Sequence, residues 1–402
     1  MIRFIVALGI YMLSPFSLLK AQTDSTVYQA LQQVISEARE QFAPDQRTKI
    51  VALVEHNVPE NRYRIESSVP KATAFIQSKI KNLPASIQMI SLPDSSVGNK
   101  RYAVVTLSVA NFRTKPGNAS EMATQALLGT QVDLLQKVGS EYRARTPEGY
   151  ISYVPSSALA AMTEAELEQW KDLPKIIYTA EFGKSWTQPN PESIRVSDLV
   201  YGNILGLIAE QGAYYQVAYP DGRSGYVLKE EALKMDEWLA SRSLSADNLI
   251  SSAKTMMGLP YLWGGTSVKG VDCSGFTKTI YFMNGYVIPR DASQQVLAGE
   301  HIDILDEQGH FEPEKALQNL KPADLLFFAA GKNSNPNARV THVAMYIGNG
   351  EFIHSAGTVR INSMLKEAEN YDDFQTRTVV AAKRYMDSSD PQIQKFEENP
   401  YY

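Results

Sequence analysis

The sequence is poor in several residues on which common functions depend. Only one of its 402 residues, Cys273, is cysteine, so no disulfide forms within the chain and each domain needs an apolar core of its own. Basic residues are not in excess, since 39 lysines and arginines stand against 44 aspartates and glutamates, and they form no cluster. This balance argues against nucleic acids and anionic membranes as partners. The histidines show no pair at the close spacing of a zinc site, and we predict no metal or other cofactor.

Long apolar runs are also rare, and the clearest one lies near the N-terminus. Residues 4–19 are almost wholly apolar, Arg3 precedes them, and Ala21 offers a small residue at which a leader could be cut. The pattern predicts a signal peptide, residues 1–21, and a secreted or periplasmic mature protein with no stable membrane association. The alternative is an anchor that stays attached, although the run is short for a membrane span. A lone cysteine in an oxidising compartment favours a reactive thiol, with a buried inert cysteine as the alternative.

Hydrophobic periodicity divides the rest of the chain into domains. Residues 27–42 carry apolar side chains at helical spacing, and strand-like runs and a second helical pattern follow. Further on, two stretches of short strands each contain a Gly-Tyr pair after a turn, Gly149-Tyr150 and Gly225-Tyr226, which predicts two similar β-barrels. The predicted order is an N-terminal helix with a small ββαβ unit (22–100), two SH3-like barrels (101–162 and 175–240) around a helical connector (163–174), an α+β domain (241–388) and a polar tail that frays (389–402).

Cys273 has the surroundings of a nucleophile. Glycines flank it, Asp272 precedes it, and an apolar run of helical character, residues 276–282, follows. A cysteine at a helix N-terminus lies near unpaired backbone N–H groups, whose partial positive charge favours the thiolate. With a histidine nearby, we expect Cys273 to act as a nucleophile.

Two histidines fall on a predicted β-hairpin. His342 lies in an alternating strand pattern, and His354 follows the turn Asn349-Gly350, which is a strong hairpin signal. Because a hairpin makes its two strands neighbours, His342 and His354 can approach each other. One imidazole then acts as the base toward Cys273 and the other orients it, as in acyl transfer. The alternative for either residue is a histidine that only completes the core.

Several short motifs of the last domain occur together in the order and spacing of one enzyme family. They are Pro260-Tyr261-Leu262-Trp263-Gly264-Gly265, Asp272-Cys273-Ser274-Gly275-Phe276, Pro289-Arg290 with Ser293-Gln294-Gln295, Ala323-Asp324-Leu325-Leu326-Phe327-Phe328, Thr341-His342-Val343-Ala344-Met345-Tyr346-Ile347-Gly348 and Phe352-Ile353-His354-Ser355-Ala356. This set resembles the NlpC-type cell-wall cysteine peptidases. Together with the barrels it resembles a γ-D-glutamyl-L-diamino acid endopeptidase branch that carries bacterial SH3-like domains. The resemblance implies a papain-like α+β catalytic domain and hydrolysis of peptidoglycan stem peptides.

The resemblance also implies catalytic roles for individual residues. Cys273 is then the nucleophile, His342 the base, and His354 the third member that orients His342. Tyr261 joins the backbone N–H of Cys273 in stabilising the oxyanion, a contribution of about 3 kcal/mol for each preorganised donor.

Substrate-binding residues follow from the same resemblance. The free amine of a substrate L-alanine is expected to bind Asp272 and Ser293, because an ammonium in a closed cleft needs a counter-charge. Asp272 as a plain helix N-cap is the alternative. Further residues expected to line the site are Ser274 and Trp263.

In such relatives the first barrel can cap the cleft, and Glu121 and Tyr150 are the residues expected to form that wall. Tyr153 is the alternative to Tyr150, which could also be ordinary barrel core. A capped cleft restricts the enzyme to stem peptides already freed from sugar, cut after γ-D-glutamate (L-Ala-γ-D-Glu|diamino acid). The alternatives are an amidase of related fold that cuts the sugar–peptide bond, and a non-catalytic cell-wall-binding protein.

Overall fold

The computed structural model describes residues 15–331, 338–374 and 376–402, and it divides into two compact units, residues 1–95 and 96–402. Residues 1–14 of the predicted signal peptide lie outside the described residues, and the described part of that segment begins the helix α1 (Pro15–Phe42). No helix in the described ranges combines the length and apolarity that crossing a membrane requires. The signal peptide stays a prediction.

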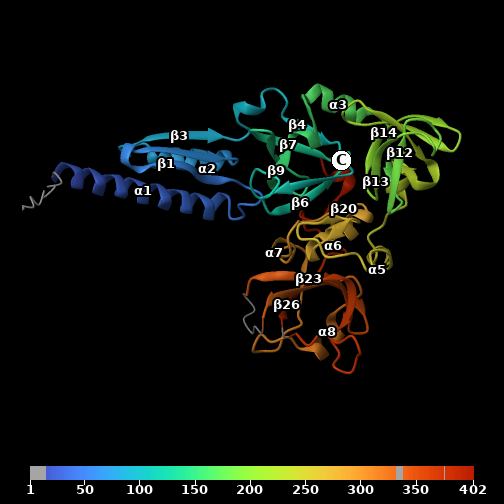
Figure 1. The fold of residues 1–402 in the computed structure, drawn as a ribbon. Coiled ribbons are helices and arrows are strands. Elements are labelled where there is room, and N and C mark those ends of the chain that lie inside the picture. Colours follow the sequence, from blue (N-terminus) through green and yellow to red (C-terminus); the bar gives the residue numbers. More distant parts are fainter. Residues whose placement is uncertain (1–14, 332–337, 375) are drawn as a thin grey trace, which may run out of the picture. The chain divides into compact units, whose positions relative to one another are not determined.

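The first unit is a small sheet packed against two helices (Figure 1). Its elements after α1 are β1 (Val51–Asn57), β2 (Arg62–Ser67), α2 (Pro70–Ile80) and β3 (Ser86–Ser91). β1 and β2 pair antiparallel, and β2 and β3 pair parallel across the helical crossover. Leu31 and Ile35 of α1 are buried with Ile65 and Ile76, because the apolar side chains of the helices recur at helical spacing. The expected ββαβ order is present.

Two β-barrels open the second unit. The strands of the first are β4 (Tyr102–Val105), β5 (Val109–Arg113), β6 (Met122–Leu127), β7 (Gln131–Val138), β8 (Glu141–Arg145), β9 (Ile151–Pro155) and β10 (Leu159–Met162). Those of the second are β11 (Lys175–Tyr178), β12 (Phe182–Trp186), β13 (Arg195–Val200), β14 (Ile204–Gln211), β15 (Tyr214–Ala218), β16 (Ser224–Leu228) and β17 (Ala232–Lys234).

The strand orders show that the barrels repeat one topology. The first sheet runs β10-β4-β7-β8-β9-β5-β6, and the second runs β13-β12-β16-β15-β14-β11-β17. When the strands of each barrel are numbered in chain order and the second order is reversed, the two orders are identical. The connector between them is α3 (Glu164–Asp172), whose N-cap Thr163 forms a capping box with Glu166.

The last domain places its helices before most of its sheet, as expected for α+β. The helices are α4 (Met235–Ala240), α5 (Ala246–Thr255), α6 (Cys273–Met283), α7 (Ala292–Gln295) and α8 (Pro313–Asn319). The main sheet has the order β21-β26-β22-β23-β24-β25. Its strands are β21 (Glu300–Ile302), β22 (Leu325–Ala330), β23 (Val340–Gly348), β24 (Glu351–Ala356), β25 (Thr358–Ser363) and β26 (Arg377–Arg384), and two short strands, β18 (Thr266–Ser267) and β19 (Gly270–Val271), precede α6.

Both faces of the main sheet of this domain are buried. Phe276 and Ile280 of α6 share one apolar cluster with Val343 of β23, whereas Ala344 shares a second cluster with Phe328. In the middle of β23, alternation therefore sends Val343 and Met345 toward α6, and Ala344 and Tyr346 to the far side of the sheet. Cys273, at the start of α6, belongs to the first cluster.

The tail does not fray. Its strand β27 (Gln394–Lys395) pairs antiparallel with β20 (Tyr286–Val287), and Phe396 is buried in the core that contains α6. The expectation of a frayed tail was wrong because the few apolar residues of this segment, Ile393, Phe396 and Tyr402, all pack against that core.

Candidate active site

Cys273 is the first residue of α6, and contacts of Asp272 fix the start of that helix. The Asp272 side chain accepts hydrogen bonds from the backbone N–H groups of Gly275 (2.6 Å) and Gly264 (2.9 Å). Position 275 requires glycine, because a Cβ there would lie 1.9 Å from the carbonyl oxygen of Gly265. The N-cap that we considered as an alternative for Asp272 is confirmed. The thiol is held, buried, at the N-terminus of the helix.

The sulfur of Cys273 lies against strand β23. It accepts hydrogen bonds from the backbone N–H of Val343, the residue after His342, and from that of Ser274. Burial and the Asp272 carboxylate raise the pKa of the thiol to about 12, although these two hydrogen bonds act in the opposite direction. Burial and the Asp272 charge therefore outweigh the effect of the helix N-terminus, which favours the thiolate. The thiol is protonated, so a base has to take its proton during any reaction.

His342 and His354 lie side by side on the hairpin of β23 and β24. Nε2 of His342 is 2.9 Å from Nδ1 of His354, and Nε2 of His354 is 3.0 Å from Oδ1 of Asn362 on β25. The amide of Asn362 is oriented by its own nitrogen, which donates to the carbonyl of Asn370 (2.9 Å). Side chains from three neighbouring strands thus form one hydrogen-bonded row, which confirms that the hairpin brings the two histidines together.

The row determines which ring nitrogens carry protons. Burial lowers the pKa of both histidines, that of His354 to about 4 and that of His342 well below its usual value, so both rings are neutral. Oδ1 of Asn362 can only accept, so Nε2–H of His354 donates to it. Nδ1 of His354 then accepts from Nε2–H of His342. Nδ1 of His342 keeps its lone pair and is the atom that can take a proton.

Tyr261 lies near the thiol. Its backbone N–H donates to the carbonyl of Gly357 (2.9 Å), which ties the loop before α6 to the turn between β24 and β25. Burial, followed by the charges of Cys273 and Asp272, raises the pKa of the phenol, so the hydroxyl stays protonated. A protonated hydroxyl in this place can donate a hydrogen bond to a developing oxyanion.

Arg290 is a buried cation to which the sequence analysis gave no role. Its guanidinium donates to both carboxylate oxygens of Asp272 (2.7 and 3.1 Å), to Oγ of Ser274 (3.1 Å) and to Oγ1 of Thr124 in the first barrel (2.9 Å). Only 1% of its side chain is exposed. Because Arg290 neutralises Asp272, this carboxylate is already paired before any substrate ammonium arrives.

Side chains of the first barrel contact the catalytic domain. Oη of Tyr150 donates to Oδ2 of Asp291 (3.3 Å), and Nε1 of Trp263 donates to Oε1 of Glu121 (2.9 Å). The alternative to Tyr150, Tyr153, instead packs against an arginine within the barrel. Tyr150 therefore contacts the catalytic domain, and its role in a wall of the site stays a prediction.

Asp291 adds negative charge beside Tyr150. Its carboxylate lies 4.0 Å from the Arg290 guanidinium, which Asp272 already holds at 2.7 Å. Two carboxylates therefore lie near one cation. Asp291 precedes α7, the short helix on which Ser293 lies half-buried. Across the described ranges, no group of three or more histidine, cysteine, aspartate or glutamate side chains is arranged to hold a metal ion.

Comparisons with known proteins agree with these domains. Residues 258–379 match the model of the NlpC/P60 family, and residues 112–159 match that of the bacterial dipeptidyl-peptidase Sh3 domain. A gamma-D-glutamyl-L-lysine dipeptidyl-peptidase of Bacillus cereus is 34% identical over 248 residues, which are 59% of this chain and 68% of that protein. The chain belongs to the NlpC/P60 family.

Two further similarities extend over more of this NlpC/P60 chain. Dipeptidyl-peptidase 6 of Lysinibacillus sphaericus is 25% identical over 289 residues, which are 69% of this chain and 97% of that protein. The crystal structure of an NlpC/P60 family protein from Bacillus cereus aligns with a TM-score of 0.57 and a sequence identity of 26%. The alignment covers 71% of this chain and 99% of the Bacillus cereus chain. The predicted fold class and family are therefore confirmed, and the chain is a cysteine peptidase with an SH3-like region.

Besides Arg290, the sequence analysis missed two polar residues of this NlpC/P60 site, Asp291 and Asn362. Asp291 lies between Pro289-Arg290 and Ser293-Gln294-Gln295, two pieces of a motif that was quoted without it, and a carboxylate next to a cation is a weak signal. Asn362 gave no signal, because its contact with His354 joins diagonal neighbours of two paired strands. Both residues become visible only when the register of β24 and β25 and the position of the first barrel are known.

Proposed function

We propose that the protein hydrolyses peptidoglycan stem peptides after γ-D-glutamate and requires a free N-terminal L-alanine. The name of the Bacillus cereus relative, gamma-D-glutamyl-L-lysine dipeptidyl-peptidase, supports this choice of bond. The observation that carries the proposal is the pairing of Tyr150 with Asp291, which puts barrel residues and a second carboxylate beside the Asp272–Arg290 pair at the start of the Cys273 helix. A cell-wall substrate also agrees with the signal peptide predicted for residues 1–21.

In the first half of the reaction, the sulfur of Cys273 attacks the γ-carbonyl carbon of D-glutamate. Nδ1 of His342 takes the thiol proton as the C–S bond forms, and Nε2–H of His342 keeps its bond to His354. The hydroxyl of Tyr261 and the backbone N–H of Cys273 donate to the oxyanion. When the C–N bond breaks, His342 returns the proton to the departing amine of the diamino acid.

In the second half, water hydrolyses the thioester that joins L-Ala-γ-D-Glu to Cys273. His342 removes a proton from the attacking water, the C–S bond breaks, and the sulfur takes the proton back. The free dipeptide leaves and the protonated thiol is restored. The buried, neutral His342–His354 row suits this cycle, because it can hold one proton transiently and release it again.

The free amine of L-alanine is assigned to Asp291, Glu121 and Tyr150. An ammonium needs a carboxylate that is not already neutralised, and Arg290 occupies Asp272. Asp291 lies farther from the Arg290 guanidinium than Asp272 does, at 4.0 Å against 2.7 Å, and the carboxylate of Glu121 accepts from the Trp263 indole. We therefore transfer the amine-binding role from Asp272 to Asp291, and keep Ser293, Ser274 and Trp263 as lining residues.

The first test compares two substrates that differ by one charge. We expect the tripeptide L-Ala-γ-D-Glu-L-Lys to yield L-Ala-γ-D-Glu, and its N-acetylated form to be cleaved with a kcat/KM lower by about 10–100-fold. The reason is that a charge-assisted hydrogen bond in a closed site contributes about 1.5–3 kcal/mol. Mass spectrometry of the products identifies the bond that is cut.

Other outcomes of this test distinguish the alternatives. An amidase of related fold would release the peptide from a muramyl peptide and ignore acetylation of a free stem peptide. A non-catalytic wall-binding protein would bind isolated sacculi and convert neither tripeptide. Equal rates on the free and acetylated tripeptides would contradict the requirement for a free N-terminus.

A second prediction concerns Asn362, which sets the proton positions of the histidine row. Asn362→Leu should lower kcat by about tenfold and leave KM unchanged, because His354 loses the bond that keeps its Nδ1 an acceptor and the loss of one such bond costs about 1.4 kcal/mol. Asn362→Asp is the matched control, since it keeps the acceptor. Its added negative charge raises the pKa of His354 and moves the acidic limb of the pH profile to higher pH. Full kcat in Asn362→Leu would show that the row does not need Asn362.

A further inference from the structure

The segment 393–402, here called the clasp, is anchored on the catalytic domain. The ring of Phe396 packs against those of Phe282 and Trp238, with distances between ring centroids of 5.1 and 5.6 Å. The backbone N–H of Phe396 donates to the carbonyl of Gly285 (2.9 Å). Tyr402 stacks on Phe396 at 4.0 Å. Phe282 belongs to α6, so the clasp is fixed to the helix that begins with Cys273.

Two residues of the clasp, Asn399 and Tyr401, contact the first barrel. Oη of Tyr401 donates to Oδ2 of Asp133 on β7 (2.6 Å), and the same carboxylate oxygen is 3.5 Å from Arg145, the last residue of β8. Nδ2 of Asn399, which is 2% exposed, is 3.4 Å from the carbonyl of Pro147. Both contacts meet the barrel next to the turn that joins β8 to β9.

That turn, residues 146–150, carries Tyr150 at its end. It is closed by hydrogen bonds from Thr146 N–H to the carbonyl of Tyr150 (2.9 Å) and from Gly149 N–H to the carbonyl of Thr146 (2.8 Å). These hydrogen bonds connect the middle of the turn to Tyr150. A shift of residue 148 is therefore expected to displace the Tyr150 side chain as well.

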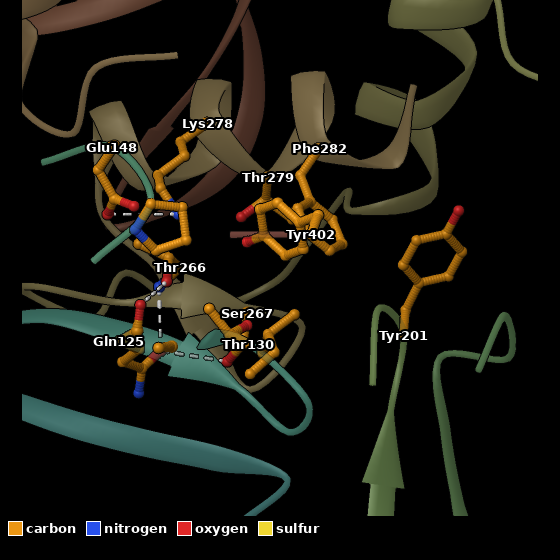
Figure 2. A pocket seen from close by; sticks show the side chains of 13 residues that line it. Gln125, Thr130, Glu148, Tyr201, Thr266, Ser267, Lys278, Thr279, Phe282 and Tyr402 are labelled. Carbon is orange, nitrogen blue, oxygen red and sulfur yellow. Dashed lines mark hydrogen bonds and ion pairs between the residues drawn. The ribbon is translucent and has the colours of Figure 1, made fainter. Parts of the chain in front are cut away.

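A buried ion pair fixes the middle of the turn to α6. Nζ of Lys278 is 3.6 Å from Oε1 of Glu148, and the two side chains are 14% and 2% exposed. Figure 2 shows Glu148 and Lys278 facing each other at the pocket that Tyr402 and Phe282 also line. Oε1 of Glu148 has no hydrogen-bond partner among the described residues, so the charge of Lys278 is its main compensation.

We propose that the clasp and the Lys278–Glu148 pair are positioning elements that select substrates with a free N-terminus. They hold the Tyr150 turn against the helix of Cys273, so that the Tyr150 hydroxyl stays within reach of Asp291. A displacement of about 1 Å at a positioned group is enough to lose most of its effect on a reaction. The proposal rests on the proposed function, because it concerns how the free-amine wall is kept in place.

The experiment measures selectivity, defined as the ratio of kcat/KM for L-Ala-γ-D-Glu-L-Lys to that for its N-acetylated form. Tyr401→Phe removes a single hydroxyl and leaves the stacked rings of the clasp intact, and Glu148→Gln removes the charge of the pair while keeping its shape. We expect each variant to lower the ratio by about tenfold. The main cause should be a higher KM for the free tripeptide, which lowers its kcat/KM. Glu397→Ala, an exposed position in the same segment, is the matched control and keeps the wild-type ratio.

The results separate this proposal from the proposed function. A wild-type ratio near one overturns the proposed function and with it the role of the clasp. A high wild-type ratio that both Tyr401→Phe and Glu148→Gln retain overturns the clasp alone. A merely structural role would lower the melting temperature of the variants and leave the ratio unchanged. If Glu148→Gln fails to fold, Tyr401→Phe still decides, because it leaves every buried charge paired.

Discussion

Cys273→Ala should abolish release of L-Ala-γ-D-Glu from the free tripeptide, with a loss in kcat of about 10⁴-fold or more. Cys273 is the only cysteine of the chain, so no second thiol can replace it. The oxyanion donors and His342 remain in the variant, but without the sulfur no thioester forms. Product release from a defined tripeptide, followed by mass spectrometry, measures the loss.

The fold should survive this substitution. Asp272 caps α6 through the backbone N–H of Gly275, and that contact does not involve the thiol. The backbone N–H groups of Val343 and Ser274 lose their acceptor. Cys273→Ser is the matched control, because its hydroxyl can accept the same bonds and is a far weaker nucleophile. Turnover by Cys273→Ala at a rate near that of the wild type would refute the hydrolase assignment.

The elements that the sequence predicts well are those with a local signal. The start of α6 at Cys273 follows from the apolar run behind it, and the approach of His342 and His354 follows from the Asn349-Gly350 turn. The repeated Gly-Tyr turns are likewise enough to predict a pair of barrels with one topology. In each case the residues that decide the structure are near one another in the chain.

What the sequence could not predict depends on contacts between distant segments. The thiol pKa is raised because folding buries the sulfur beside Asp272, and the rule for helix N-termini considers only the opposing effect. Arg290 shows its role only once Thr124 of the first barrel is seen to contact it. The tail has too few apolar residues for a periodic signal, yet Phe396 is almost fully buried.

Arg290→Met should lower the free energy of unfolding of the catalytic domain by about 3–5 kcal/mol, the largest effect on stability that we expect from a single substitution here. The methionine fills most of the space but leaves the Asp272 carboxylate, 7% exposed, without its cation. Ser274 and Thr124 lose a donor as well. Urea unfolding, followed by tryptophan fluorescence, measures the change.

A double variant without either charge separates two contributions to the free energy of unfolding. One is the cost of leaving the Asp272 carboxylate unpaired, and the other is the net stabilisation by the Arg290–Asp272 pair. In Arg290→Met with Asp272→Asn, the asparagine oxygen can still accept from Gly275 N–H, so the helix cap remains and most of the lost stability should return. The double variant should also have a lower pKa of the Cys273 thiol, because the Asp272 carboxylate raises that pKa by more than the Arg290 cation, which is lost as well, lowers it. Thiol alkylation at increasing pH should therefore begin at a lower pH in the double variant than in the wild type.

The control is a more exposed pair in the same domain. Lys315 and Asp303 lie 2.8 Å apart, with 31% and 64% of their side chains exposed, so Lys315→Met should cost no more than about 1 kcal/mol. The difference between the two substitutions then reports the burial of Asp272 rather than the loss of a positive charge. A small effect of Arg290→Met, close to that of Lys315→Met, would mean that water or another cation compensates Asp272. The pairing of Asp272 with Arg290 would then be no argument against Asp272 as the residue that binds the substrate amine.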